Sequence, residues 1–167
     1  LTLEVTNACN LACEYCAYRD LYVNNNPKKD MYMTLDKVRP LFDYLSDLWS
    51  KEGIVEHLTY ISFYGGEPLL NMPFIKDSVD YFNNIKNIRR FRYSLTTNAV
   101  YLDRNIEFLV QNDFHILVSM DGDYTGHSYR KMKSGENSFE TVYKNLKMVQ
   151  SRYPSYFKNN VSFNAVI

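Results

Sequence analysis

Three cysteines lie close together near the start of the chain, at Cys9, Cys13 and Cys16, and the sequence contains no other cysteine. A disulfide framework uses an even number of cysteines spread along the chain. Thiols gathered in one short segment are instead predicted to converge on one common partner. The chemistry of this segment therefore depends on which metal or redox centre the three thiols bind.

Three kinds of partner are compatible with the spacing. Cys13 and Cys16 have the separation of a zinc half-site or of a redox pair. A closed zinc site needs four ligands, and no second cysteine pair follows, while a redox pair leaves Cys9 unexplained. A cubane held by three thiolates keeps its fourth iron open to an outside ligand, unlike the four-cysteine electron carriers. The odd count favours this cluster, with a zinc-stabilised interaction domain and an iron–sulfur electron-transfer module as the alternatives.

Further candidate residues follow strand-like segments. Glycines in the turn Gly65-Gly66-Glu67-Pro68 permit close approach of the main chain to a ligand, although such a turn is also common as plain structure. Polar side chains that could bind a ligand or cap the next element come after two later strands. A planar cation suited to a carboxylate lies further on. These residues are Asn98, Ser119, Asp121 and Arg130.

Apolar periodicity predicts strands that alternate with helices. The strands are expected at about 1–6, 58–64, 91–97, 116–120 and 161–167. The helices are expected at about 34–50, from 71 or 72, from 103 and from 139. In the first helix an apolar stripe is predicted, and Pro40 would start or kink that helix. The stripe comprises Leu35, Val38, Leu41, Leu45 and Leu48.

This alternation implies an α/β fold with parallel strands and right-handed crossovers, in either a doubly wound sheet or a barrel. All candidate motifs follow strands, and ligand sites of both architectures form at the carboxyl ends of strands. The segment between the first strand and the first helix is long and includes the polar stretch 24–30, so it is expected to be functional.

The composition excludes some partners. The chain has 167 residues, and its 19 basic and 19 acidic residues cancel. Such a balance gives no general attraction to nucleic acid, and no apolar run is long enough to span a bilayer. We therefore expect neither nucleic acid nor membrane as a partner.

The spacing Cys-x3-Cys-x2-Cys, with Tyr15 before the last cysteine and Thr6–Leu11 leading in, resembles the signature of the radical S-adenosylmethionine (SAM) superfamily. The resemblance implies a partial (β/α)6 TIM-like barrel, of which five strands are present here. It implies a [4Fe–4S] cluster on the three cysteines, with SAM on the open iron. Reductive cleavage of SAM would give a 5′-deoxyadenosyl radical that abstracts hydrogen from a substrate. The SAM contacts it implies are Tyr15, Gly65, Gly66, Glu67, Asn98, Ser119, Asp121 and Arg130.

The pattern from Ser119 to Leu146 resembles the peptide- and protein-modifying subgroup, which includes sulfatase maturases and ribosomal-peptide maturases. It implies a peptide or protein substrate, a small metabolite being the alternative. We expect a cytoplasmic enzyme with a low-potential electron donor of the flavodoxin or ferredoxin type. His127 is expected to serve local structure. Residues 1–167 are read as one radical SAM core cut at both ends, without the sixth strand and any C-terminal SPASM domain.

Overall fold

The fold was analysed in a computed structural model that describes residues 1–16, 30–51, 58–85 and 90–166. Most of the polar stretch 24–30, which was expected to be functional, lies outside the described residues. The five predicted strands are all present and all parallel, in the order β1-β2-β3-β4-β5. They are β1 (Thr2–Thr6), β2 (Leu58–Gly65), β3 (Arg90–Thr97), β4 (His115–Ser119) and β5 (Val161–Asn164).

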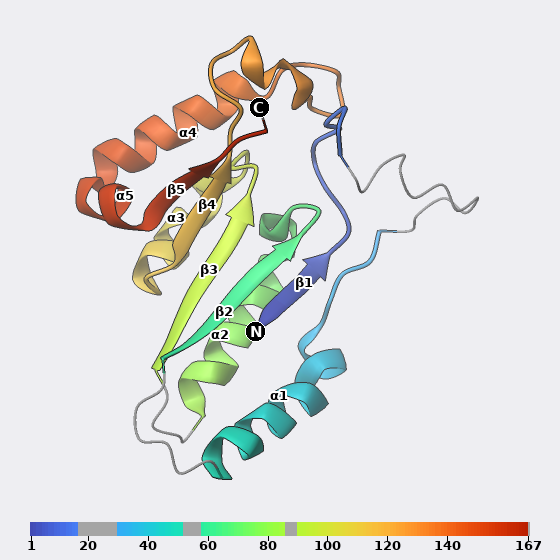
Figure 1. The fold of residues 1–167 in the computed structure, drawn as a ribbon, viewed down its shortest axis with the longest axis vertical. Coiled ribbons are helices and arrows are strands. Elements are labelled where there is room, and N and C mark those ends of the chain that lie inside the picture. Colours follow the sequence, from blue (N-terminus) through green and yellow to red (C-terminus); the bar gives the residue numbers. More distant parts are fainter. Residues whose placement is uncertain (17–29, 52–57, 86–89, 167) are drawn as a thin grey trace.

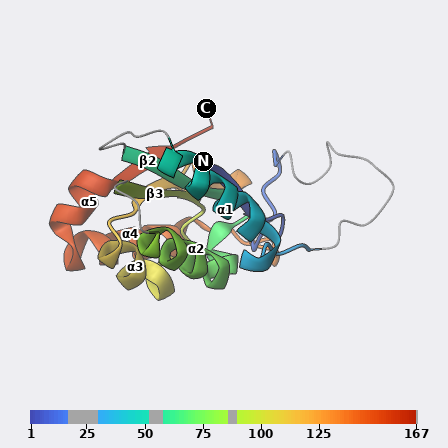
Figure 2. The same cartoon turned by 90° about the horizontal axis from the view of Figure 1, so that it is seen from below.

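Helices connect successive strands, as parallel pairing requires. Figure 1 shows the strand arrows pointing toward the end of the sheet where the cysteine segment and the loop after β4 lie. Figure 2 shows α2, α3 and α4 together on one side of the sheet. The helices are α1 (Leu35–Lys51), α2 (Met72–Asn84), α3 (Leu102–Gln111), α4 (Phe139–Arg152) and α5 (Pro154–Asn160), with 3₁₀ turns η1 (Pro68–Asn71) and η2 (Gly126–Tyr129). None of the described helices is long and apolar enough to cross a membrane. The predicted α/β fold and partial barrel are confirmed.

The buried face of α1 differs from the predicted stripe. Leu41 and Leu48 are 45% and 38% exposed, whereas Phe42 is fully buried. The Phe42 ring packs 4.6 Å from that of Phe82, and Trp49 packs 5.9 Å from Phe91. Large aromatic side chains bury more apolar area than leucine, so they decide which face of the helix turns inward. Pro40 lies inside the helix, which begins at Leu35 and not at the proline.

The C-terminal part also differs from the prediction. A short helix, α5, follows α4 and begins at Pro154, where a proline at the first helical position is well tolerated. The strand after it ends at Asn164, three residues before the predicted end at Ile167, which lies outside the described residues. A run of apolar residues alone therefore overestimated the length of β5.

The sheet face opposite the helices carries a row of polar side chains. Thr2, Ser62, Ser94 and His115 are partners in register across four neighbouring strands. The Ser62 and Ser94 hydroxyls lie 2.8 Å apart and hydrogen-bond. Complete TIM barrels fill this space with bulky branched side chains. Short polar side chains leave it hollow, and a cavity of about 380 Å³ lies over this row.

Candidate active site

The cysteine segment is fixed on one side by the turn after β2. The Gly66 N–H donates to the Thr6 carbonyl and the Glu67 N–H to the Ala8 carbonyl, both at 2.8 Å. A Cβ on Gly65, which has φ of 147°, would lie 2.2 Å from the Thr6 oxygen, and one on Gly66 would lie 2.3 Å from the Ala8 oxygen. The two glycines therefore allow β2 to end directly against the start of the cysteine segment.

The other side of the segment pairs with the loop after η2. The Ala12 N–H donates to the Lys131 carbonyl at 2.7 Å, and the Glu14 N–H donates to the Tyr129 carbonyl at 3.0 Å. The Lys131 ammonium also contacts the Glu14 carboxylate. The cysteine segment is thus held between two chain segments that are far apart in the sequence.

The three cysteines are free, half-buried and gathered around one cavity of about 230 Å³ at the carboxyl ends of the strands. Most residues predicted for the site line this cavity together. They are Cys9, Cys13, Cys16, Tyr15, Gly65, Gly66, Asn98, Ser119 and Arg130. Two predicted residues, Glu67 and Asp121, do not line it. They lie behind the cavity, and their contacts are described below.

The thiols lie in surroundings that disfavour their charged form. Burial raises the pKa of Cys9 to about 11, against the opposing hydrogen bond from the Leu11 N–H at 3.4 Å. Burial also raises the pKa of Cys13, while the nearby Arg130 cation opposes the shift. Thiolates here need a compensating positive charge, which iron supplies when a cluster binds.

The residues present fit an iron–sulfur cluster. Among the described residues, no three His, Cys, Asp or Glu side chains converge closely enough to hold a single metal ion. A cubane does not need such convergence, because each thiolate binds a different iron. The buried Asn10 Nδ2 atom also lacks a hydrogen-bond partner within the described structure. The Asn10 Oδ1 atom, not this donor, faces the Cys9 sulfur at 3.9 Å, so the fit to a cluster rests on the three thiols around one cavity.

Glu67 is fully buried, and its carboxylate joins the ends of β2 and β3. One oxygen accepts hydrogen bonds from the Leu69 N–H at 3.0 Å and the Thr97 hydroxyl at 2.7 Å, and the other accepts from the Asn98 N–H at 2.8 Å. Burial raises its pKa to about 7 although these three donors favour the charged form. In this arrangement the side chain binds protein groups, and its predicted contact with SAM stays a prediction.

Asp121 forms a buried ion pair with Arg130. The Arg130 Nε and Nη2 atoms donate to the two carboxylate oxygens at 2.8 and 3.0 Å. The same carboxylate accepts hydrogen bonds from the Tyr15 hydroxyl and, at 2.9 Å, from the Val166 N–H. Burial pushes the Asp121 pKa upward, but these donors outweigh burial and hold the pKa below its ordinary value. Asp121 therefore ties the cysteine segment, the loop after η2 and the end of β5 together.

His127 serves the local structure of the loop, as predicted. Its Nδ1 atom accepts from the Asp121 N–H at 3.3 Å, which leaves Nε2 to donate to the Ser138 hydroxyl at 3.0 Å. That hydroxyl donates to the Arg130 carbonyl at 2.6 Å. Burial lowers the His127 pKa, in keeping with a neutral ring. This chain of hydrogen bonds fixes the backbone that carries Arg130.

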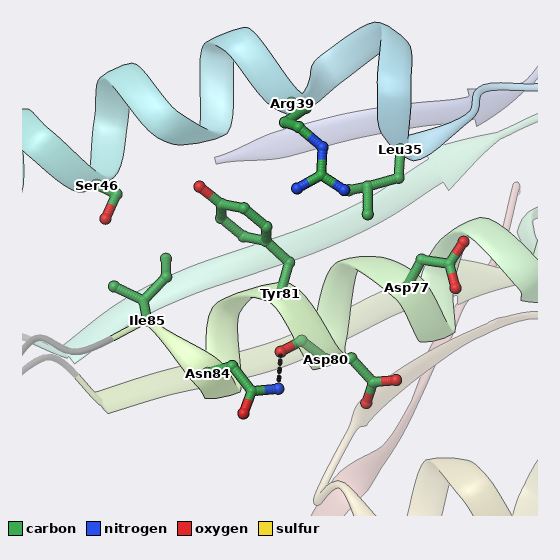
Figure 3. A pocket seen from close by; sticks show the side chains of 8 residues that line it. All are labelled: Leu35, Arg39, Ser46, Asp77, Asp80, Tyr81, Asn84 and Ile85. Atoms are coloured by element: carbon green, nitrogen blue, oxygen red, sulfur yellow. Dashed lines mark hydrogen bonds between the residues drawn. The ribbon is translucent and has the colours of Figure 1, made fainter.

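Two other hollows differ in their relation to the cysteines. The 380 Å³ cavity over the polar sheet face shares Tyr64 and Thr96 with the cysteine cavity, so the two adjoin. A hollow of about 560 Å³ on the outside is lined only by α1, α2 and the residue after α2. Figure 3 shows Tyr81 between the two helices, with Arg39 extending toward it from α1. This outer hollow contains no residue of the strand ends.

A comparison with protein families matches residues 3–166 to the radical SAM superfamily, so the chain belongs to that superfamily. Over 152 residues it is 34% identical to an uncharacterized protein of Methanocaldococcus jannaschii, covering 90% of this chain and 48% of that protein. It is 30% identical over 164 residues to the serine-type anaerobic sulfatase-maturating enzyme of Bacteroides thetaiotaomicron, covering 95% and 36%.

The solved structure of native anSMEcpe with bound AdoMet superimposes with a TM-score of 0.72 at 27% identity, covering 98% of this chain and 42% of that one. The chain thus spans less than half the length of these relatives. Membership of the superfamily agrees with the prediction from the cysteine spacing, and resemblance to the sulfatase-maturase subgroup agrees with the prediction from the Ser119–Leu146 pattern.

Sequence reasoning assigned no role to two residues that the site uses. Asn10 directly follows the first cysteine, and this position was the only feature of the sequence that could have indicated a role for it in the site. Ser138 lies within the Ser119–Leu146 pattern, just before the helix predicted from 139, where a serine is expected to cap the helix. Its side chain instead caps no N–H of α4 and binds His127 and the Arg130 carbonyl. A hydroxyl that bridges two loop segments leaves no periodic trace in the sequence.

Proposed function

We propose that this chain is the catalytic core of an enzyme that cleaves SAM reductively at a [4Fe–4S] cluster and abstracts hydrogen from a peptide or protein. The observation that carries the proposal is the shared cavity, in which three free thiols meet the Gly65-Gly66 turn, Asn98 and Arg130. The bound cluster and SAM supply the electron and the 5′-deoxyadenosyl radical. Cys9, Cys13 and Cys16 would each hold one iron.

The protein groups around the cavity would orient SAM. Two Arg130 nitrogens are used by Asp121, and because the guanidinium also lines the cavity, its remaining donors can meet the SAM carboxylate. Ser119 and Asn98 add neutral polar groups at the ends of the neighbouring strands β4 and β3. The Gly65-Gly66 turn brings main-chain atoms to the wall, and the absence of a Cβ lets this turn lie directly against Thr6 and Ala8. Tyr15 would cover the site from the cysteine segment.

The substrate would occupy the cavity over the Ser62–Ser94 pair, next to the cysteines. Tyr64 and Thr96 border both spaces, so a group bound over the Ser62–Ser94 pair lies beside the place of SAM. Hydroxyl and imidazole groups can bind the amides of an extended peptide. Relatives named as sulfatase-maturating enzymes support a protein substrate. A C-terminal domain with auxiliary clusters, a cytoplasmic location and a flavodoxin- or ferredoxin-type donor belong to the same proposal.

The cluster is tested by anaerobic reconstitution of the full-length protein, with iron and sulfide analysis and measurement of 5′-deoxyadenosine formed from SAM. Replacing Cys9, Cys13 or Cys16 by Ala should abolish the SAM-cleaving cluster, because thiolates hold the irons. His127→Gln, outside the cavity, serves as a control that should keep the iron. Full iron content and SAM cleavage in any cysteine variant would contradict the assignment.

The substrate class is tested separately. The full-length enzyme is incubated with SAM, a reductant and a peptide encoded beside its gene, and the peptide is analysed by mass spectrometry. Loss of two hydrogens or another defined mass change supports the peptide proposal. Unmodified peptides under conditions that cleave SAM, together with consumption of a small metabolite, would exclude a maturase while leaving the SAM chemistry intact.

A further inference from the structure

Two carboxamides form a connected pair beside the Cys9 sulfur. The Asn98 Oδ1 atom accepts a hydrogen bond from the Val100 N–H at 3.0 Å, and this fixes which end of the amide is the donor. Its Nδ2 atom therefore points to the Asn10 Oδ1 atom, 2.8 Å away, and to the Cys9 Sγ atom, 3.8 Å away. Asn98 is only 7% exposed, so water does not compete freely for this donor.

The first contact orients the second amide. The Asn10 Oδ1 atom accepts from Asn98 and lies 3.9 Å from the Cys9 Sγ atom. The Asn10 amide therefore presents its oxygen to this group of atoms, and its buried Nδ2 atom makes no hydrogen bond to the Cys9 sulfur. Asn10 thus positions the Asn98 amide, and the donor that reaches the Cys9 sulfur is the Asn98 Nδ2 atom.

Hydrogen bonds to cluster sulfurs affect the reduced and oxidised states unequally. One-electron reduction adds negative charge to the cluster, so N–H donors stabilise the reduced state more than the oxidised state. Hydrogen bonding to sulfur is one of the factors that set the reduction potential of such clusters. The Leu11 N–H already donates to the Cys9 sulfur at 3.4 Å, and the Asn98 carboxamide adds a second donor from a side chain.

We propose that Asn98, which Asn10 orients, donates a hydrogen bond to the Cys9 sulfur and thereby raises the reduction potential of the cluster. The inference rests on the proposed function, since it requires the cluster, and it assigns Asn98 a role in addition to lining the SAM cavity. Both are positioning residues: Asn98 acts on the cluster through the Cys9 sulfur, and Asn10 acts through Asn98. Glu67 supports the pair by holding the Asn98 backbone N–H at 2.8 Å.

The test is a redox titration of the anaerobically reconstituted full-length protein with dithionite and mediators. The EPR signal that changes on addition of SAM identifies this cluster even if the protein carries others. In Asn98→Leu and Asn10→Leu, the ratio of reduced to oxidised cluster at a fixed applied potential should fall about tenfold, which is about 59 mV for one electron. Asn98→Asp keeps an acceptor for the Val100 N–H but removes the donor, so it should shift the ratio in the same direction.

Asn145→Leu is the matched control. The Asn145 side chain donates to the Ala99 and Val100 carbonyls at 2.9 Å, so its loss disturbs the same turn without removing a donor from Cys9. This variant should titrate like the wild type. Wild-type potentials in all the Asn10 and Asn98 variants, with weakened SAM binding, would overturn the inference and assign the pair to SAM. A wild-type protein without a SAM-responsive cluster signal would instead refute the proposed function.

Discussion

Replacing Asp121 by Asn removes the negative charge from the buried ion pair with Arg130 while keeping the shape of the side chain. The two residues are 6% and 8% exposed, so solvent screens their interaction little. The Asp121 carboxylate accepts both guanidinium contacts, the Tyr15 hydroxyl and the Val166 N–H. The amide nitrogen of Asn would be turned toward some of the groups that donate to Asp121 in the wild type, and donor would then face donor.

The expected loss follows from the charge left behind. Removing one partner of a buried ion pair leaves the other charge uncompensated, which costs about 3–5 kcal/mol. At a urea dependence of about 2 kcal/mol/M, this lowers the unfolding midpoint by roughly 1.5–2.5 M. Removing both charges relieves the penalty, so Asp121→Asn with Arg130→Met should lose less than the sum of the two single variants, by about 2 kcal/mol.

The assay is urea unfolding of the full-length apoprotein, followed by circular dichroism, for the wild type, both single variants and the double variant. Ser128→Ala serves as a reference variant that should leave the urea midpoint unchanged, because Ser128 takes no part in these contacts. If the two single effects add to within about 0.5 kcal/mol of the double variant, the residues do not act as a pair. The account of Asp121 as the tie between loop and strand ends would then be wrong.

Two further predictions concern the turn after β2. Burial raises the Glu67 pKa from 4.5 to about 7, so the stability that this group contributes is present below about pH 4.5 and is lost as the pH rises through 7. Glu67→Gln should remove this part of the pH dependence, measured as the difference in urea midpoint from the wild type across that range. Gly66→Ala would place a Cβ 2.3 Å from the Ala8 oxygen and should reduce reconstituted iron severalfold. Gly122→Ala is the control. The φ of Gly122 is 76°, so alanine there strains the backbone, but its Cβ would meet nothing within 4 Å, and this variant should keep its iron.

The sequence supported the strand order and the gathering of most site residues, because both follow from regular patterns. Alternating apolar runs locate strands, parallel strands share a carboxyl end, and motifs after each strand must then meet. The orientation of individual side chains could not be derived in this way. Nothing in the spacing of Leu41 and Phe42 indicates which of them faces the core, and the choice depends on packing against Phe82 from another helix.

The two carboxylates show most clearly where sequence reasoning ends. Glu67 and Asp121 follow strands within recognised motifs, and a charged group at such a position suggests a ligand contact. Each instead has its oxygens used by protein donors, and neither lines the cysteine cavity. Whether a carboxylate faces a ligand or the protein depends on side-chain and backbone donors from other segments of the chain, which no single segment specifies.

This arrangement has an electrostatic consequence for the cavity. With both carboxylates turned away, the described residues that line it offer thiols, amides, hydroxyls, main-chain atoms and the Arg130 guanidinium, but no carboxylate. A cluster bound by three thiolates brings negative charge, and SAM brings a carboxylate. A wall of neutral donors with one cation accommodates both, whereas an exposed Glu67 or Asp121 would repel the cluster and the SAM carboxylate group. The buried carboxylates therefore stabilise the frame of the site without adding negative charge to its surface.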